Sequence, residues 1–218
     1  MAPRRRGSSI EEFQRHWRDQ HADAVRAMPG LLRYVQNHAV LDGQGRPGFA
    51  YPGFDACAEM DFEDVAAMDR SFESAQYTGA VRQDETALIE HRGFALLLCA
   101  RQVRIDAPVS AAPVKLLTFY RFDPRSDARA ARAALEGPYA DVVARAGVLG
   151  HEQLVVQPEE HRGRIPPVCD LVDILWFAAS ADAMDFPASA VGLDAAEALA
   201  GRVFGAERLV ARPITVVH

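Results

Sequence analysis

One histidine in this sequence lies where an imidazole could carry out acid–base chemistry. His21 recurs with apolar and aromatic residues at steps of three and four positions, so they share one face of a predicted helix: Phe13, Trp17, Ala24 and Met28. An imidazole partly shielded from water beside Trp17 can take up and return a proton near neutral pH. The alternative is a core histidine that donates to a backbone carbonyl and has no chemical role.

Three polar side chains alternate along the strand predicted for residues 31–41. Tyr34, Gln36 and His38 share one face of that strand, because successive side chains point to opposite faces. We predict that this face lines a cavity and points away from the helices, since three hydrogen-bonding groups are hard to satisfy under packed helices. A register error of one residue would reverse the assignment. His38 alternatively lies at a solvated strand end.

A carboxylate on the next strand, predicted for residues 55–62, could assist a histidine. Glu59 lies opposite the apolar face of this strand and shares its own face with Asp55, Cys57 and Asp61. If that face lines the cavity, Glu59 can orient a histidine or act as a base. If the face is an exposed edge, Glu59 is a solvated carboxylate. The predicted catalytic residues are therefore His21, Tyr34, His38 and Glu59.

Further residues are candidates for binding a substrate. His151 and Gln153 repeat the spacing of Tyr34 and Gln36, and Tyr120 shares a strand face with Thr118, so these residues could form the other wall of a composite pocket. Aromatic residues in a Gly/Pro-rich loop could form a lid, or could simply close the mouth of a barrel. The predicted binding residues are Trp17, Gln36, Tyr51, Phe54, Tyr120, His151 and Gln153.

The elements that position these residues occur in the same order in both halves of the chain. Ser9 and Glu12 form a capping box that starts the first helix, and Pro29–Gly30 ends it. The first half then reads helix, strand, strand, helix, strand. The second half reads strand, helix, strand, strand, helix, strand.

The two halves overlay with an offset of about 115 to 118 residues, which places Tyr34 on His151 and Gln36 on Gln153. We predict a duplication, with domains at 9–106 and 114–218 joined by a linker at 107–113. The predicted fold is α+β: two tandem ferredoxin-like βαββαβ units whose antiparallel sheets pack into an α/β barrel. The first unit lacks most of its first strand. A few N-terminal residues, another segment or a partner chain in a homodimer must cover that edge.

Composition narrows the function classes. The chain has 218 residues and a formal net charge of -6, which gives no electrostatic footprint for nucleic acid or anionic lipid. No apolar run is long enough to span a membrane. The three cysteines match neither a disulfide framework nor a zinc pattern, so we expect buried thiols and a cytoplasmic location.

No metal or cofactor is expected. His16 and His21 are five residues apart, a spacing that puts the two rings on different faces of an α-helix. The sequence contains no HExxH motif, no Gly-rich phosphate loop at a strand-to-helix turn and no GxSxG motif.

Three sequence blocks in the first half resemble the EthD family of dimeric α/β-barrel proteins. They are FQRHWRDQHADAVRAMPGLLRYVQNHAV, FDACAEMDFEDVAAM and DETALIEHRGFALLLCARQV, in the family's order. The second half resembles a diverged copy, with Tyr139 in place of His21 and Ile174 in place of Glu59. The resemblance implies a barrel fold whose members include cofactor-free dehydratases, cyclases, decarboxylases, isomerases and monooxygenases, as well as haem enzymes.

The favoured function is a cofactor-independent lyase or isomerase that acts on a small aromatic or polyketide-like molecule. His21 would be its general acid/base, with Tyr34, Gln36 and His38 positioning a carbonyl or enolate oxygen. The alternatives are a non-catalytic protein that binds a hydrophobic ligand and a cofactor-free monooxygenase. Because Tyr139 replaces His21 in the second half, an active site would belong mainly to residues 9–106.

Overall fold

The computed structural model describes residues 1–107 and 113–218, so the predicted linker, 107–113, lies outside the described residues except at its two ends. The chain forms two compact units. Unit 1 comprises Met1–Arg46, Gly53–Ala95 and Pro213–His218, and unit 2 comprises Pro47–Pro52 and Leu96–Arg212. The predicted domains, 9–106 and 114–218, stay a prediction about sequence repeats, because each unit also contains residues from the other half.

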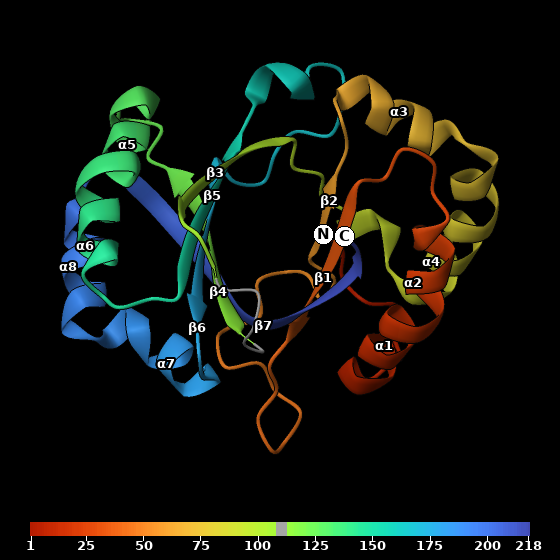
Figure 1. Cartoon of the computed structure of the whole chain (residues 1–218), viewed down its shortest axis with the longest axis horizontal. Coiled ribbons are helices and arrows are strands. Elements are labelled where there is room, and N and C mark those ends of the chain that lie inside the picture. The colour runs from red at the N-terminus through yellow and green to blue at the C-terminus, as the bar shows by residue number, and fades with distance from the viewer. Residues whose placement is uncertain (108–112) are drawn as a thin grey trace. The chain divides into compact units, whose positions relative to one another are not determined.

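Unit 1 places its helices on one side of two paired strands (Figure 1). Its elements are α1 (Ile10–His16), the π-helix η1 (Trp17–His21), α2 (Ala22–Arg26), β1 (Arg33–Ala39), β2 (Ala58–Asp61), α3 (Val65–Glu73), the π-helix η2 (Tyr77–Val81), α4 (Arg82–Leu88) and the short 3-10 helix η3 (His91–Gly93). The predicted order of helix, strand, strand and helix is confirmed.

The start and end of the first helix follow the sequence signals. The Ser9 hydroxyl accepts from the Glu12 backbone N–H, and the Glu12 carboxylate accepts from the Ser9 N–H, which completes the predicted capping box. At the other end, α2 stops at Arg26 and Gly30 has a φ of 74°. A left-handed residue after the last turn ends a helix, and glycine adopts it without strain.

Unit 2 contains a complete βαββαβ sequence of elements, and its helices cover one side of β4, β5 and β6 (Figure 1). The elements are β3 (Cys99–Ile105), β4 (Val114–Phe122), α5 (Ala128–Ala134), the π-helix η4 (Leu135–Tyr139), α6 (Ala140–Ala144), β5 (Gly150–Val156), η5 (Pro158–His161), β6 (Leu171–Phe177), α7 (Ser180–Asp185), η6 (Phe186–Ala188), α8 (Ala190–Ala198) and β7 (Val203–Val217). The predicted order for the second half is confirmed.

The strands form one seven-stranded sheet in the order β2-β1-β7-β4-β6-β5-β3, and the chain is therefore of the α+β class. Strand β3 pairs antiparallel with β5 inside unit 2, although it closes the first half of the sequence. The last residues of β7, Pro213–His218, belong to unit 1. Each unit thus includes the final strand segment of the other half.

The N-terminal residues occupy the place of the first strand that the sequence lacks. Ala2 forms an isolated bridge with Ala56, and Arg4 forms one with Ile89. The Met1 amino group donates to the carbonyl of Ala95 at 2.8 Å. A few N-terminal residues therefore cover this edge, which was one of the possibilities that the sequence left open.

The two hairpins share one register under the offsets found in the sequence. Tyr34 and Gln36 face Met60 and Ala58, whereas His151 and Gln153 face Leu175 and Asp173. The π-helices η1 and η4 also correspond, because each covers five residues, 118 positions apart. The two halves therefore place their strand residues and helix irregularities alike.

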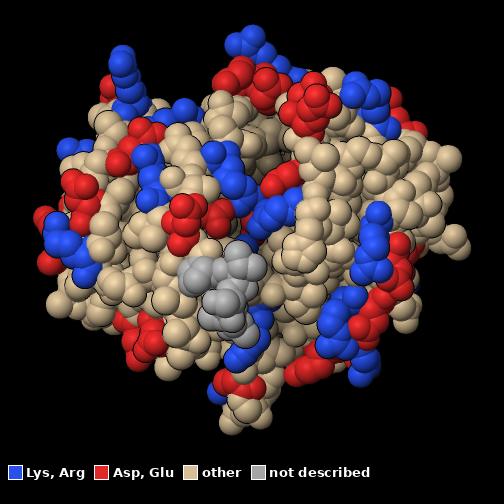
Figure 2. All heavy atoms as spheres, viewed as in Figure 1, with Lys and Arg blue, Asp and Glu red and all other residues tan. Residues whose placement is uncertain are grey.

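The surface charge and the burial of the cysteines do not point to a particular function. Figure 2 shows acidic and basic side chains interspersed over the displayed face, without one continuous basic patch. Cys57 and Cys169 are buried, as predicted, and Cys99 is only partly so. Within the described residues, none of the helices has the length and apolar character needed to cross a bilayer.

Candidate functional site

The polar face of β1 lies under the helices of unit 1. The indole Nε1 of Trp17 donates to the Tyr34 hydroxyl at 3.0 Å, and the Gln36 amide donates to the Trp17 carbonyl at 2.7 Å. The prediction that Tyr34, Gln36 and His38 point away from the helices is therefore wrong. The π-helix is the physical reason, because its first carbonyl and the Trp17 indole supply the partners that a regular helix face would lack.

The hydrogen bonds of Gln36 fix the tautomer of His38. Both amide hydrogens of Gln36 are donated, one to the Trp17 carbonyl and one to the Tyr34 hydroxyl, so its Oε1 is the acceptor of the 2.9 Å bond with His38 Nε2. His38 also packs against Trp17, with ring centroids 4.7 Å apart. Burial, and then the nearby Arg18 guanidinium, lowers the pKa of His38 to about 4. His38 is thus a neutral imidazole at pH 7, with the proton on Nε2.

The Tyr34 hydroxyl retains a proton that it does not donate within the protein. Its oxygen accepts from Trp17 and Gln36, and no acceptor for its own proton occurs among the described residues. Burial raises the pKa of Tyr34, and the two hydrogen bonds that it accepts offset this only in part. At neutral pH Tyr34 is therefore an O–H donor.

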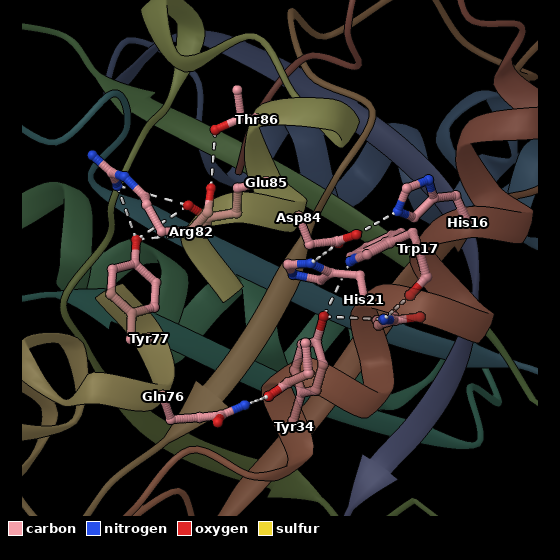
Figure 3. A network of polar contacts seen from close by, with 12 residues as sticks. His16, Trp17, His21, Tyr34, Gln76, Tyr77, Arg82, Asp84, Glu85 and Thr86 are labelled. Atoms are coloured by element: carbon pink, nitrogen blue, oxygen red, sulfur yellow. Dashed lines mark hydrogen bonds and ion pairs between the residues drawn. The ribbon is translucent and has the colours of Figure 1, made fainter. Parts of the chain in front are cut away.

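His21 forms a dyad with a carboxylate that the sequence analysis missed. Its Nδ1 lies 2.8 Å from Asp84 Oδ2, and the side chain is only 9% exposed (Figure 3). The only sequence signal was indirect, since one block of the family resemblance begins at Asp84. A carboxylate on Nδ1 holds the ring in one orientation and leaves Nε2 with a lone pair.

The second ring nitrogen of His21 can be reached by solvent. Nε2 has no hydrogen-bond partner among the described residues. Three side-chain atoms of these residues are both fully buried and without a partner: Asn37 Oδ1, Ser71 Oγ and His151 Nδ1. Nε2 of His21 is not one of them, so it is partly exposed. A bare imidazole nitrogen at a partly open position is the geometry that a general base requires.

His16 binds the other oxygen of the same carboxylate. Its Nε2 lies 2.7 Å from Asp84 Oδ1 (Figure 3). The prediction that a five-residue spacing separates the rings of His16 and His21 is therefore wrong. It assumed α-helical geometry, whereas η1 is a π-helix, in which residues five apart are hydrogen-bonded neighbours; the Ala22 N–H donates to the Trp17 carbonyl.

Asp84 is ionised in this arrangement. Burial raises the pKa of its carboxyl, but the hydrogen bonds from His21 and His16 outweigh burial, and the net effect is a pKa below the usual range. The carboxylate can therefore stabilise a positive charge that forms on His21.

Glu59 lies on the opposite face of the sheet and does not join this network. It accepts from Asn37 at 2.9 Å and from Arg33 at 3.2 Å, and it is nearly buried. Asp84, unlike Glu59, lies on the helix side of β1, and it is the carboxylate that hydrogen-bonds to His21.

The binding residues predicted in the second half form a separate cluster inside unit 2. His151 Nε2 lies 2.7 Å from Asp173 Oδ1, the Tyr139 hydroxyl donates to Asp173 Oδ2 at 2.7 Å, and the Gln153 amide donates to the Leu135 carbonyl at 3.2 Å. The Tyr120 hydroxyl lies 3.5 Å from that of Tyr139. All of these side chains are buried. They bind one another, and their predicted contact with a substrate stays a prediction.

The two aromatic residues predicted to form a lid differ in exposure. Tyr51 is 53% exposed and belongs to unit 2, whereas Phe54 is half-buried and belongs to unit 1. A lid role stays a prediction for both. The described residues contain no group of three or more His, Cys, Asp or Glu side chains that could hold a metal ion.

Solved structures with a similar fold cover nearly the whole of this chain. The structure is similar to a "putative monooxygenase" from Lactobacillus acidophilus NCFM, with a TM-score of 0.56 and 14% identity over 96% of this chain and 90% of the other. A protein given the same description, from Fusobacterium nucleatum subsp. nucleatum ATCC 25586, has a TM-score of 0.57 and 7% identity over 97% and 88% of the two chains. At these identities the likeness shows the fold. No curated protein matches the sequence.

The family comparison matches the part of the chain that carries the His21–Asp84 dyad. Residues 5–92 match the EthD domain. This range contains β1, β2 and helices α1–α4, and thus every residue of the network around His21. The EthD-domain match therefore covers the part of the chain in which the candidate site lies.

Proposed function

We propose that this protein is an enzyme that uses His21 as a general acid/base on a small molecule with an acidic C–H or O–H group. The observation that carries the proposal is the His21–Asp84 dyad, in which Nδ1 is bound by a carboxylate and Nε2 has no hydrogen-bond partner among the described residues. The match of residues 5–92 to the EthD domain supports a role in small-molecule processing.

The first step is the transfer of a proton from the substrate to Nε2 of His21. The imidazolium that forms keeps its Nδ1–H on Asp84, whose lowered pKa keeps it anionic and able to stabilise the new charge. A positioned group of this kind accelerates proton transfer by roughly 10²–10⁴-fold.

Tyr34 supplies the matching interaction for the substrate oxygen. Its O–H has no acceptor among the described residues, and its raised pKa keeps the proton in place, so it can donate to an enolate or phenolate oxygen. Its oxygen accepts from Trp17 and Gln36, which fixes its position. In this mechanism Gln36 acts through Tyr34 and need not contact the substrate.

The substrate class follows from the charges in the network. Asp84 is anionic, His38 is neutral, and Arg82, the permanent cation in Figure 3, lies 3.7 Å from Glu85 and donates to the Tyr77 hydroxyl. Arg18, which lies near His38, is likewise paired with Asp19. A substrate carboxylate would thus be repelled by Asp84, and both of these arginines already have a carboxylate partner. We propose an uncharged enolisable or phenolic compound.

In the favoured reaction, a lyase or isomerase, His21 returns the proton to a second atom of the substrate or to a leaving group. A cofactor-free monooxygenase is the second candidate. Two structural neighbours described as "putative monooxygenase" support it, and both reactions would begin with the same deprotonation. In the monooxygenase, the carbanion or phenolate passes its electrons to O₂, which is the oxidant.

The second half of the chain has a different residue at the position of the proposed base. We infer that residues 9–106 and 114–218 descend from one duplicated ferredoxin-like unit, because the two hairpins share a register and the two π-helices correspond. Tyr139 stands where the first half has His21, so only the first copy retains the proposed base.

Deuterium exchange tests the proposal without knowledge of the product. The protein is incubated in D₂O with a panel of uncharged phenols and 1,3-dicarbonyl compounds, and exchange is followed by NMR together with oxygen uptake. The proposal expects exchange that is lost in His21→Ala and kept in His91→Ala, a matched change at an exposed histidine. Exchange that survives His21→Ala would remove His21 as the base. Oxygen uptake that also requires His21 would identify the monooxygenase.

A further inference from the structure

We propose that His16 is a positioning residue: it binds one oxygen of Asp84 and thereby holds the other oxygen against Nδ1 of His21. The inference rests on the proposed function in that His21 is the acid/base group. The geometry that carries it is one carboxylate with a different imidazole on each oxygen.

The two hydrogen bonds restrict the orientation of Asp84. His16 Nε2 lies 2.7 Å from Oδ1 and His21 Nδ1 lies 2.8 Å from Oδ2, so rotation of the carboxylate would break both. A single contact with His21 would leave the carboxylate free to turn toward water, because its side chain is 20% exposed. His16 therefore restrains the group that orients the proposed base.

Exposure decreases along the three residues. The side chain of His16 is 27% exposed, that of Asp84 20% and that of His21 9%. His16 thus meets solvent directly and can exchange protons with it. Its protonation changes the charge that Asp84 presents to His21.

The other charged and titratable groups around His21 do not replace His16 in this role. On α4, Glu85 is engaged by Arg82 and Tyr77. On η1, the exposed Arg18 and Asp19 bind each other. On β1, Tyr34 and His38 bind Gln36, and at neutral pH both are uncharged. Of the described side chains, only His16 and His21 hydrogen-bond to Asp84.

The experiment measures the reactivity of His21 with diethyl pyrocarbonate, a reagent that modifies neutral imidazole. Initial rates at His21 are read by peptide mass spectrometry from singly modified protein, between about pH 4.5 and 8.5. The variants are His16→Gln, which keeps an N–H donor for Asp84 but does not titrate, and His16→Ala, which has neither property. His91→Gln is the control, since that side chain is exposed.

Above pH 8, His16→Ala should lower the rate of His21 modification by about tenfold, because Asp84 is no longer held against the ring, and His16→Gln should restore the wild-type rate through its N–H donor. A wild-type rate in folded His16→Ala would overturn the positioning role. A His16→Gln rate as low as that of His16→Ala would also overturn it, because the donor to Asp84 would then make no difference. If His16→Ala fails to fold, His16→Leu, which also lacks a donor, replaces it.

This readout is independent of turnover. Diethyl pyrocarbonate reacts with the imidazole itself, so the positioning role of His16 can be shown even if no substrate exchanges deuterium. Conversely, loss of exchange in His21→Ala together with equal modification rates in wild type and His16→Ala would leave the proposed function standing without the role of His16.

Discussion

Each unit contains a histidine hydrogen-bonded to an aspartate, but the two pairs differ in what surrounds them. In unit 1, His21 belongs to a π-helix and Asp84 to α4, and Nε2 of the histidine is left partly open. In unit 2, His151 and Asp173 lie on neighbouring strands, both are at most 1% exposed, and His151 Nδ1 is buried without a partner. A His–Asp pair is thus no site by itself; access to the second nitrogen distinguishes the two.

The framework around the two pairs is the same. Gln36 donates to the Trp17 carbonyl at the start of one π-helix, and Gln153 donates to the Leu135 carbonyl at the start of the other. In both units a strand glutamine satisfies the carbonyl at the irregular turn. The shared framework accounts for the fold, and the side chains at the position of His21 and Tyr139 account for the difference in chemistry.

The largest expected effect separates the two histidines by activity. His21→Ala should lower deuterium exchange by roughly 10²–10⁴-fold, because it removes the proposed proton acceptor. Its effect on unfolding in urea should be small, because the ring is partly open and water can replace it at Asp84. His151→Ala should show the opposite pattern, with lower stability and an unchanged rate per folded molecule. Equal loss of exchange in both variants would end the comparison.

The second expected effect separates the two aspartates by stability. Asp173→Asn should lower the free energy of unfolding by about 3 kcal/mol, since it disturbs a fully buried group that accepts from His151, Tyr139 and Gln153. Asp84→Asn should cost about 1 kcal/mol, because solvent reaches that carboxyl group. Urea unfolding measures both. A larger cost for Asp84→Asn would contradict the division into an open and a closed pair.

The third expected effect is a loss of folding stability at acid pH, caused by His38 in unit 1. The pKa of His38 is about 4 in the folded chain and about 6.5 when unfolded, so the unfolded state binds more protons between these values. Stability is therefore full above about pH 6.5 and falls as the pH drops toward 4. At pH 5 the loss is about 2 kcal/mol.

His38→Gln should remove most of this loss, because glutamine does not titrate. Urea unfolding of wild type and variant at pH 7 and pH 5 tests it. The position in unit 2 that corresponds to His38 by the offset of Gln36 and Gln153 is Val155, so unit 2 has no such group there. An unchanged acid sensitivity in His38→Gln would assign the loss to other residues.

The smallest expected effect tests the shared framework. Ser9→Ala and Asp127→Ala each remove an N-cap that accepts a backbone N–H at the start of the first helix of a unit. Each should cost about 1 kcal/mol. Thermal unfolding of the two variants should show similar losses. A several-fold difference would show that the two helices contribute unequally to stability.

The sequence predicts the scaffold well because local signals agree there. The capping box at Ser9, the Gly30 stop and the repeat offset lead to the observed elements and to the matching registers of the hairpins. The edge without a first strand is also anticipated, and the N-terminal residues cover it. These features depend on a few neighbouring residues or on a period, both of which one sequence displays.

The candidate site was predicted only in part, because it depends on a helix irregularity and on a distant contact. Tyr34 lies under the helices that carry His21, in a separate set of hydrogen bonds with Trp17 and Gln36. The face of β1 is the reverse of the predicted one, because the hydrogen-bond partners offered by Trp17 have no sequence signal. Asp84 lies 63 residues from His21, and no spacing rule connects the two. A π-helix has no strong sequence signature, so His16 was assigned to the wrong face.

The π-helix η1 has a consequence for how this site can be gained or lost. A single π-turn is equivalent to one residue inserted into an α-helix, with the extra length absorbed locally. Deleting one exposed residue there, such as Gln20, would restore regular winding and rotate all that follows. His16 and the histidine after it could then no longer meet at one carboxylate. A one-residue insertion or deletion in this helix, which is a change of one codon, therefore decides whether His16, Asp84 and His21 can meet. A sequence comparison that scores only residue identity would overlook such a change.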